Sequence, residues 1–152
     1  MTLPDDFREF LQCLNAHSVR YLVVGGHAVS FHGYPRFTVD VDVVVVPELD
    51  NALSLVAALG EFGFGALAVT ADDFTRPLTV ALGRAPYQID IMTYIKGVAV
   101  DEAWSRRVAG VLDGVDVFFV SKGDLITNKR AVGRPEDLAD VERLRDEDED
   151  AG

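Results

Sequence analysis

Residues 22–28 have the sequence Leu-Val-Val-Gly-Gly-His-Ala, and residues 36–43 have the sequence Arg-Phe-Thr-Val-Asp-Val-Asp-Val. The apolar run Tyr21–Val24 predicts a strand that the glycine pair interrupts. The stretch from His27 to His32 is long enough for a helix of about two turns. These segments therefore predict a strand, a glycine turn and a short helix, followed by a second strand that carries two aspartates.

Asp40 and Asp42 are two residues apart in Val39–Val46, a run rich in β-branched residues that predicts a strand. Side chains two apart on a strand point to the same face, with Cα atoms roughly 6.5–7 Å apart. Magnesium in phosphoryl-transfer enzymes is held by one or two carboxylates plus substrate phosphates, and paired ions suit in-line displacement. The spacing predicts a magnesium site.

Other interpretations of the aspartate pair remain open. The two charges could mark the polar face of an edge strand. However, Val43–Val46 indicates a buried strand, beside which two unpaired anions would suffer desolvation and mutual repulsion. Haloacid dehalogenase-type phosphatases and some sugar-nucleotide glycosyltransferases also use aspartates at this spacing, but there the apolar strand precedes the pair. Here the apolar run follows Asp42, which disfavours both classes.

The Gly25-Gly26 turn is predicted to expose backbone N–H groups at the start of a helix, where the helix dipole favours an anion such as a triphosphate. A glycine pair after a strand more often makes a tight turn without any ligand. The glycine turn supports a phosphate-binding site only in combination with the two aspartates.

Taken together, the two quoted segments resemble the signature of the DNA polymerase beta-like nucleotidyltransferases. The Arg-x-Thr-x-Asp-x-Asp form resembles the toxin-type and antibiotic-modifying branches of that superfamily. The resemblance implies that Gly25 and Gly26 contact the β- and γ-phosphates of a nucleoside triphosphate (NTP), while Asp40 and Asp42 bind two Mg²⁺ ions. Gly26 stands where many members have serine, so a hydroxyl contact to phosphate is absent.

A third carboxylate is expected on a later strand, and Asp90 within Tyr87–Met92 is the candidate. The resemblance implies that Asp90 ligates the catalytic Mg²⁺ and accepts the proton of the attacking hydroxyl. The alternative is an aspartate at a solvent-facing strand position. Asp72 and Asp73 form a competing pair, but their context predicts capping of backbone amides at a helix start.

Three further polar residues are weaker candidates. Arg36 could neutralise the triphosphate or the carboxylates, or form a structural ion pair. Thr38 could contact the nucleotide or serve only as a strand residue. Lys129, in a helical segment that resembles the one following the catalytic core of these enzymes, is a candidate phosphate contact, against the alternative of a solvated lysine. No role is assigned to Arg134.

The remaining patterns predict an α+β fold with a mixed, mainly antiparallel sheet flanked by helices, which agrees with the nucleotidyltransferase fold that the resemblance implies. The hairpin signals are turns near residues 83–86 and at Asp113-Gly114. Helices are predicted to start near Pro4, Pro47, Ser121 and Pro135. We expect one domain over residues 1–145 and a frayed acidic tail over residues 146–152.

Composition limits the environment and the partners. The chain has 152 residues and a formal net charge of -11, which disfavours bulk DNA binding. It has no apolar run of the roughly 18 residues needed to span a membrane, and no basic signal-peptide start. The single cysteine, Cys13, falls in a helical apolar pattern and indicates core packing in a reduced compartment. A cytoplasmic protein is expected.

The resemblance implies Mg²⁺-dependent transfer of a nucleoside monophosphate from an NTP, such as ATP, with release of pyrophosphate. The sequence leaves the acceptor open among a small molecule, a tRNA end and a protein side chain. A nucleotide-binding toxin-antitoxin or regulatory protein with the same fold and no turnover is the main alternative, and a purely structural domain is a third. A homodimer or an antitoxin partner is a further hypothesis, because the short chain leaves little room for an acceptor site.

Overall fold

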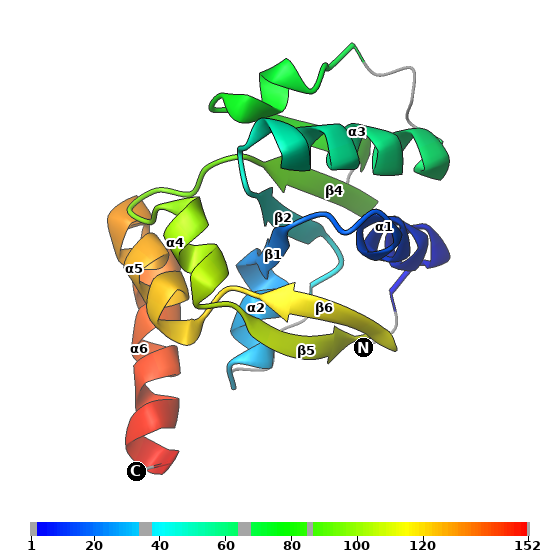
Figure 1. Cartoon of the computed structure of the whole chain (residues 1–152). Helices are drawn as coiled ribbons and strands as arrows, with labels where there is room; N and C mark the ends of the chain where they lie inside the picture. The colour runs from blue at the N-terminus through cyan, green and yellow to red at the C-terminus, as the bar shows by residue number, and fades with distance from the viewer. Residues whose placement is uncertain (1–2, 34–37, 64–67, 85–86, 152) are drawn as a thin grey trace.

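The computed structural model describes residues 3–33, 38–63, 68–84 and 87–151. Its centre is a six-stranded sheet with the strand order β3-β4-β2-β1-β6-β5 (Figure 1). The strands are β1 (Tyr21–Val24), β2 (Val41–Val45), β3 (Thr79–Arg84), β4 (Tyr87–Met92), β5 (Val108–Leu112) and β6 (Val115–Phe119).

Antiparallel and parallel neighbours alternate across the sheet. The pairs β3/β4, β1/β2 and β5/β6 are antiparallel, whereas β2/β4 and β1/β6 are parallel. The predicted α+β fold with a mixed, mainly antiparallel sheet is confirmed. The parallel pairs bring together strands that lie far apart in the sequence.

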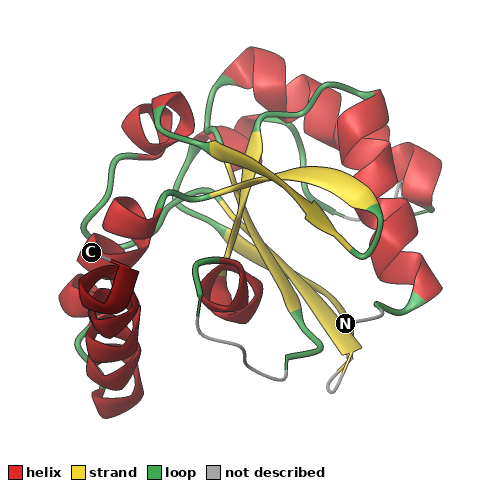
Figure 2. Ribbon diagram, turned by 90° about the horizontal axis from the view of Figure 1, so that it is seen from below, coloured by secondary structure: helices red, strands yellow, loops and turns green. Residues whose placement is uncertain are grey.

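Helices lie on both faces of this sheet. They are α1 (Asp5–Ala16), α2 (Gly25–Phe31), α3 (Leu49–Phe62), α4 (Val100–Ser105), α5 (Lys122–Val132) and α6 (Pro135–Ala151), with a 3₁₀ turn η1 at Asp72–Thr75. Helices α1 and α3 pack together on one face, while α2 lies against the other (Figures 1 and 2). Helices α5 and α6 form an antiparallel pair beside the sheet. None of the helices in the described ranges has the length and apolar character needed to cross a membrane.

Local sequence signals behave as expected at several element ends. Asp113 and Gly114 have φ angles of 46° and 80°, as the two-residue β5–β6 hairpin turn requires. The Ser121 hydroxyl accepts a hydrogen bond from the Asp124 N–H at 3.1 Å and caps α5. The aspartates of η1 start a short helical turn, in which Asp73 accepts a hydrogen bond from the Thr70 N–H.

Two boundaries and one whole helix differ from the predictions. Strand β2 begins at Val41, so Asp40 lies just before the strand rather than within it. Helix α2 begins at Gly25 instead of His27, because the glycine turn itself supplies the first helical residues. Helix α4 was not predicted, since six residues are too short to show a helical repeat of apolar positions.

Candidate active site

Asp42 and Asp90 lie side by side on neighbouring parallel strands. Strand β2 pairs with β4 so that Asp42 is the direct register partner of Asp90. The flanking residues Ile89 and Ile91 are buried in the core beneath α1 and α3. Because side chains alternate along a strand, the two carboxylates point to the opposite face. The sheet therefore brings together two acids that are 48 residues apart.

Electrostatics mark Asp42 as the most perturbed carboxyl of this pair. Burial, a hydrogen bond with Asp90 and the negative charges of Asp90 and Asp40 raise the pKa of Asp42 from 3.8 to about 7, against the positive charge of Lys129. Two acids this close cannot both ionise without a large repulsion. Asp42 therefore retains its proton to a higher pH than a free aspartate does.

Gln88 connects the predicted carboxylates. Its side-chain Nε2 donates to Asp90 Oδ1 at 2.7 Å, and its backbone N–H donates to Asp40 Oδ1 at 3.2 Å. Gln88 was not predicted as a site residue. The available signal was its position two residues before Asp90, which places both side chains on one face of β4.

Within the described ranges, no three His, Cys, Asp or Glu side chains are close enough together to enclose a metal ion by themselves. The structure instead provides a close Asp42–Asp90 pair, with Asp40 near enough for its charge to raise the pKa of Asp42. Such a site needs substrate oxygens to complete a coordination shell. That requirement fits Mg²⁺, which binds through one or two carboxylates together with phosphates and water.

The glycine turn borders the Asp42 carboxylate. Gly25 has a φ of +68°, and a Cβ atom at this position would overlap Asp42 Oδ2. Gly26 faces Thr38, because a Cβ at Gly26 would lie 2.9 Å from Thr38 Oγ1. Both glycines thus fill places where a side chain would collide with a predicted site residue.

Lys129 lies in α5 and is only 8% exposed. Its Nζ pairs with Asp140 at 3.0 Å and with Asp137 at 3.4 Å. Arg134 also pairs with Asp137, at 2.7 Å. The alternative of a solvated lysine is therefore wrong, and the Lys129 charge is felt at Asp42.

The two histidines of the α2 region, His27 and His32, have different surroundings. His27 is 4% exposed, and its Nε2 has no hydrogen-bond partner in the described part of the chain. Burial is the main reason that the pKa of His27 is lowered, so the ring is neutral near pH 7. His32 Nε2 contacts the Val120 carbonyl oxygen at 2.7 Å. Arg36 lies outside the described residues.

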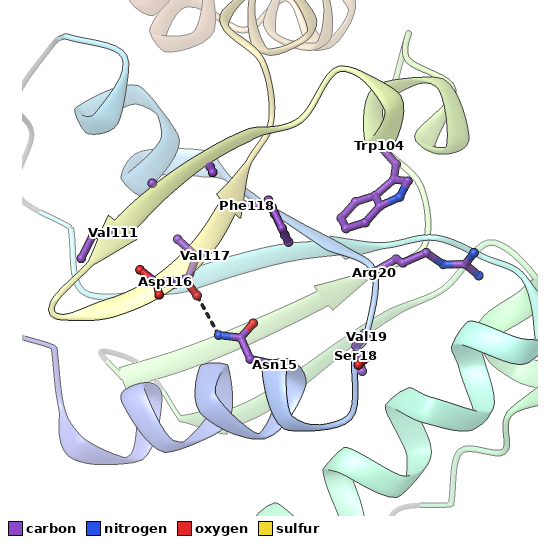
Figure 3. Close-up of a pocket in the computed structure, with 11 residues that line it drawn as sticks. Asn15, Ser18, Val19, Arg20, Trp104, Val111, Asp116, Val117 and Phe118 are labelled. Atoms are coloured by element: carbon purple, nitrogen blue, oxygen red, sulfur yellow. Dashed lines mark hydrogen bonds between the residues drawn. The ribbon is translucent and has the colours of Figure 1, made fainter.

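A separate groove of about 740 Å³ lies on the α1 face of the sheet. Figure 3 shows Trp104, Phe118 and Val111 along it, with Asn15 donating a hydrogen bond to the Asp116 carbonyl. None of the predicted site residues that the structure describes lines this groove. It is a surface distinct from the carboxylate pair.

Comparison with known proteins identifies the family of this chain. No curated protein matches the sequence at a significant level. The sequence model of the family described as "nucleotidyltransferase of unknown function (DUF6036)" matches residues 2–145. Because that match covers nearly all of the 152 residues, the chain belongs to this nucleotidyltransferase family.

Proposed function

We propose that the protein transfers a nucleoside monophosphate from an NTP to an acceptor and releases pyrophosphate, with Mg²⁺ bound between the nucleotide and the aspartates. Within the nucleotidyltransferases, the Arg-x-Thr-x-Asp-x-Asp segment favours the polymerase beta-like superfamily and its toxin-type or antibiotic-modifying branch. The acceptor is a small molecule, a tRNA end or a protein side chain.

The observation that carries this proposal is the contact between the glycine turn and the carboxylate pair. Gly25 leaves just enough space for Asp42, whose register partner is Asp90. A triphosphate lying along the turn would meet backbone N–H groups on one side and the aspartates on the other. This arrangement brings the phosphate chain and the metal-binding oxygens together, which phosphoryl transfer requires.

The raised pKa of Asp42 is consistent with a cation site. A partly buried carboxyl such as Asp42, which holds a proton near neutral pH, gains from replacing that proton with a divalent ion. When bound there, Mg²⁺ would neutralise charge that develops on the phosphates and lower the pKa of the acceptor hydroxyl.

The residues of this chain have separate roles in the proposed reaction. The acceptor oxygen forms a bond to the α-phosphorus as the bond to the β-phosphate oxygen breaks, and pyrophosphate leaves. Asp90 accepts the proton of the acceptor hydroxyl, while Gln88 orients Asp90 through the 2.7 Å hydrogen bond. Asp40, Asp42 and Asp90 would hold the metal, and Gly25 and Gly26 would contact the phosphates.

Thr38, Arg36 and Lys129 are assigned supporting roles. Thr38 packs against Gly26 and would shape the phosphate-binding turn. Lys129 contributes positive charge near Asp42, although Asp137 and Asp140 already pair with its ammonium group. Arg36 is proposed to neutralise the triphosphate.

The test incubates the protein with Mg²⁺, cell extract as the source of acceptors, and NTPs labelled at either the α- or the γ-phosphate. The measurement is which product carries the label. The proposal expects α-label to enter a product and γ-label to leave in pyrophosphate. Asp42→Asn and Asp90→Asn should each abolish transfer, whereas Asp101→Asn, an exposed aspartate on α4, should not.

A binding assay tests the site even if the extract does not contain the acceptor. Fluorescent NTP should bind in a Mg²⁺-dependent manner and lose affinity in Asp42→Asn. Mg²⁺-dependent binding without any transfer of α-label would support the nucleotide-binding protein without turnover. NTP binding that survives the loss of Asp40, Asp42 and Asp90 together would contradict the site.

A further inference from the structure

Strand β5 is an edge of the sheet, and its own sequence lacks the residues that commonly protect an edge strand. Among the described residues, no strand pairs with its outer side, and β5 forms the lower edge of the sheet in Figure 1. Edge strands are commonly protected by lysine, proline or a bulge. The β5 sequence, Val-Ala-Gly-Val-Leu, has neither residue and pairs with β6 in unbroken register.

The hairpin geometry identifies the backbone groups that face outward. Leu112 and Val115 flank the two-residue turn and form a hydrogen-bonded pair. Because hydrogen-bonded and non-hydrogen-bonded pairs alternate in antiparallel strands, Val108, Gly110 and Leu112 bond to β6. The N–H and C=O groups of Ala109 and Val111 therefore point away from the sheet. Both side chains are exposed, and Val111 is 61% exposed.

We propose that the β5 edge pairs with β5 of a second copy of this chain, antiparallel about a two-fold axis at Gly110. In this register Ala109 lies opposite Val111 of the other copy, so the outward N–H and C=O groups of both residues are satisfied. The register overlaps the whole strand, and each side chain faces one from the same side of the sheet.

Charge at the two ends of β5 favours this register. Arg107 precedes the strand and Asp113 follows it, so each Arg107 would lie opposite an Asp113 of the other copy. The Arg107 guanidinium is held 4.1 Å over the Trp104 ring, on the groove side of the hairpin. Asp113 already accepts a hydrogen bond from the Leu3 N–H at 2.8 Å and lies 3.6 Å from Arg8 Nε.

Apolar surface is continuous with the proposed strand pair. Val111 lies at one end of the groove that contains Trp104 and Phe118 (Figure 3). Pairing of two β5 strands would place Val111 beside Ala109 of the other copy and join the two grooves. A single strand pair buries little area, and the net charge of -11 opposes association. We therefore expect a weak dimer.

The test is sedimentation of the full chain over a range of concentrations at about 0.15 M salt, where the Debye length is about 8 Å. The mass should rise from 16.6 kDa toward twice that value. Ala109→Pro removes an outward N–H that β6 does not use, and it should leave a folded monomer. The control Ala109→Ser retains that N–H and should still dimerise.

Further measurements test the proposal even if the proline variant misfolds. Val111→Lys should also give a folded monomer, and Arg107→Glu should weaken association on the order of tenfold. Exchange of the Ala109 and Val111 amide hydrogens should slow as concentration rises, because pairing buries them. A monomer at every concentration overturns the proposal. A dimer also overturns the proposal if it persists in Val111→Lys. The same holds if its formation does not slow hydrogen exchange at the Ala109 and Val111 amides.

Discussion

Asp42 on β2 is the direct register partner of Asp90 on β4, and this neighbour is one reason why the pKa of Asp42 is raised to about 7. Parallel pairing places the two carboxylates on the same face at the same level of the sheet. Burial removes the water that would otherwise screen their repulsion. Ionisation of Asp42 is therefore unfavourable beside Asp90, and the proposed Mg²⁺ would offset that cost.

The first prediction concerns the pH dependence of stability. Because the folded pKa of Asp42 lies above the unfolded value of 3.8, the folded protein holds this proton more tightly than the unfolded chain does. The associated stability is fully present below about pH 4 and is lost as the pH rises through about 7. Asp42→Asn should raise the melting temperature at about pH 8 by roughly 2–8 °C, for about 1–2 kcal/mol, and by little at about pH 4.

Thermal melts of both proteins at several pH values measure this effect, with Asp101→Asn as the control. Mg²⁺ should raise the melting temperature of the original chain more at high pH than at low pH, because protons compete for the same oxygens. If the Asp42→Asn variant is less stable than the original chain at about pH 8, the raised pKa of Asp42 is contradicted.

The second prediction separates backbone strain from collision at the glycine turn. Gly25 and Gly114 both have positive φ, at +68° and +80°, so alanine should cost each about 1–2 kcal/mol of stability. Only at Gly25 would the new Cβ overlap Asp42, since no side chain or backbone atom of the described residues is found within 4 Å of a Cβ at Gly114. Gly25→Ala should therefore reduce Mg²⁺-dependent NTP binding by more than about tenfold, whereas Gly114→Ala should retain it. Equal loss of binding in both variants would show that strain alone is responsible.

The third prediction concerns the space between Gly26 and Thr38. A Cβ at Gly26 would lie 2.9 Å from Thr38 Oγ1 and 3.2 Å from Thr38 Cγ2. Gly26→Ser should destabilise the protein, and Thr38→Ala, which removes both atoms, should relieve part of that cost. Urea melts of the single and double variants should give a favourable coupling of about 0.5–3 kcal/mol. Additive effects would show that the two positions do not compete for space.

The fourth prediction concerns the buried charges between α5 and α6. Lys129→Met leaves Asp137 and Asp140 without the ammonium group that lies between them. We expect a loss of about 3–5 kcal/mol in urea unfolding, compared with little change for Lys96→Met at an exposed position. Asp140→Asn in the Lys129→Met background should restore part of the loss. A stable Lys129→Met protein that has lost only NTP affinity would instead identify Lys129 as a phosphate contact.

The sequence predicted features whose causes are local. The turn at Asp113-Gly114 follows from the positive φ angles of both residues, and the Ser121 cap follows from a hydroxyl three residues before an unpaired N–H. The polarity of β2 was also visible, because the apolar run comes after Asp42. Helix α4 was missed, since so short a helix is stabilised by packing more than by its own pattern.

The sequence by itself determined the residue types of the site, the spacing of Asp40 and Asp42, and the glycine turn before them. Only the tertiary structure decided that Asp90 lies beside Asp42, that Thr38 fills the space at Gly26, and that Lys129 is buried between two aspartates. The physical reason is the range of the interactions. Turns and caps depend on neighbouring residues, whereas the strand pairing and burial that set the charges of this site join segments far apart in the chain.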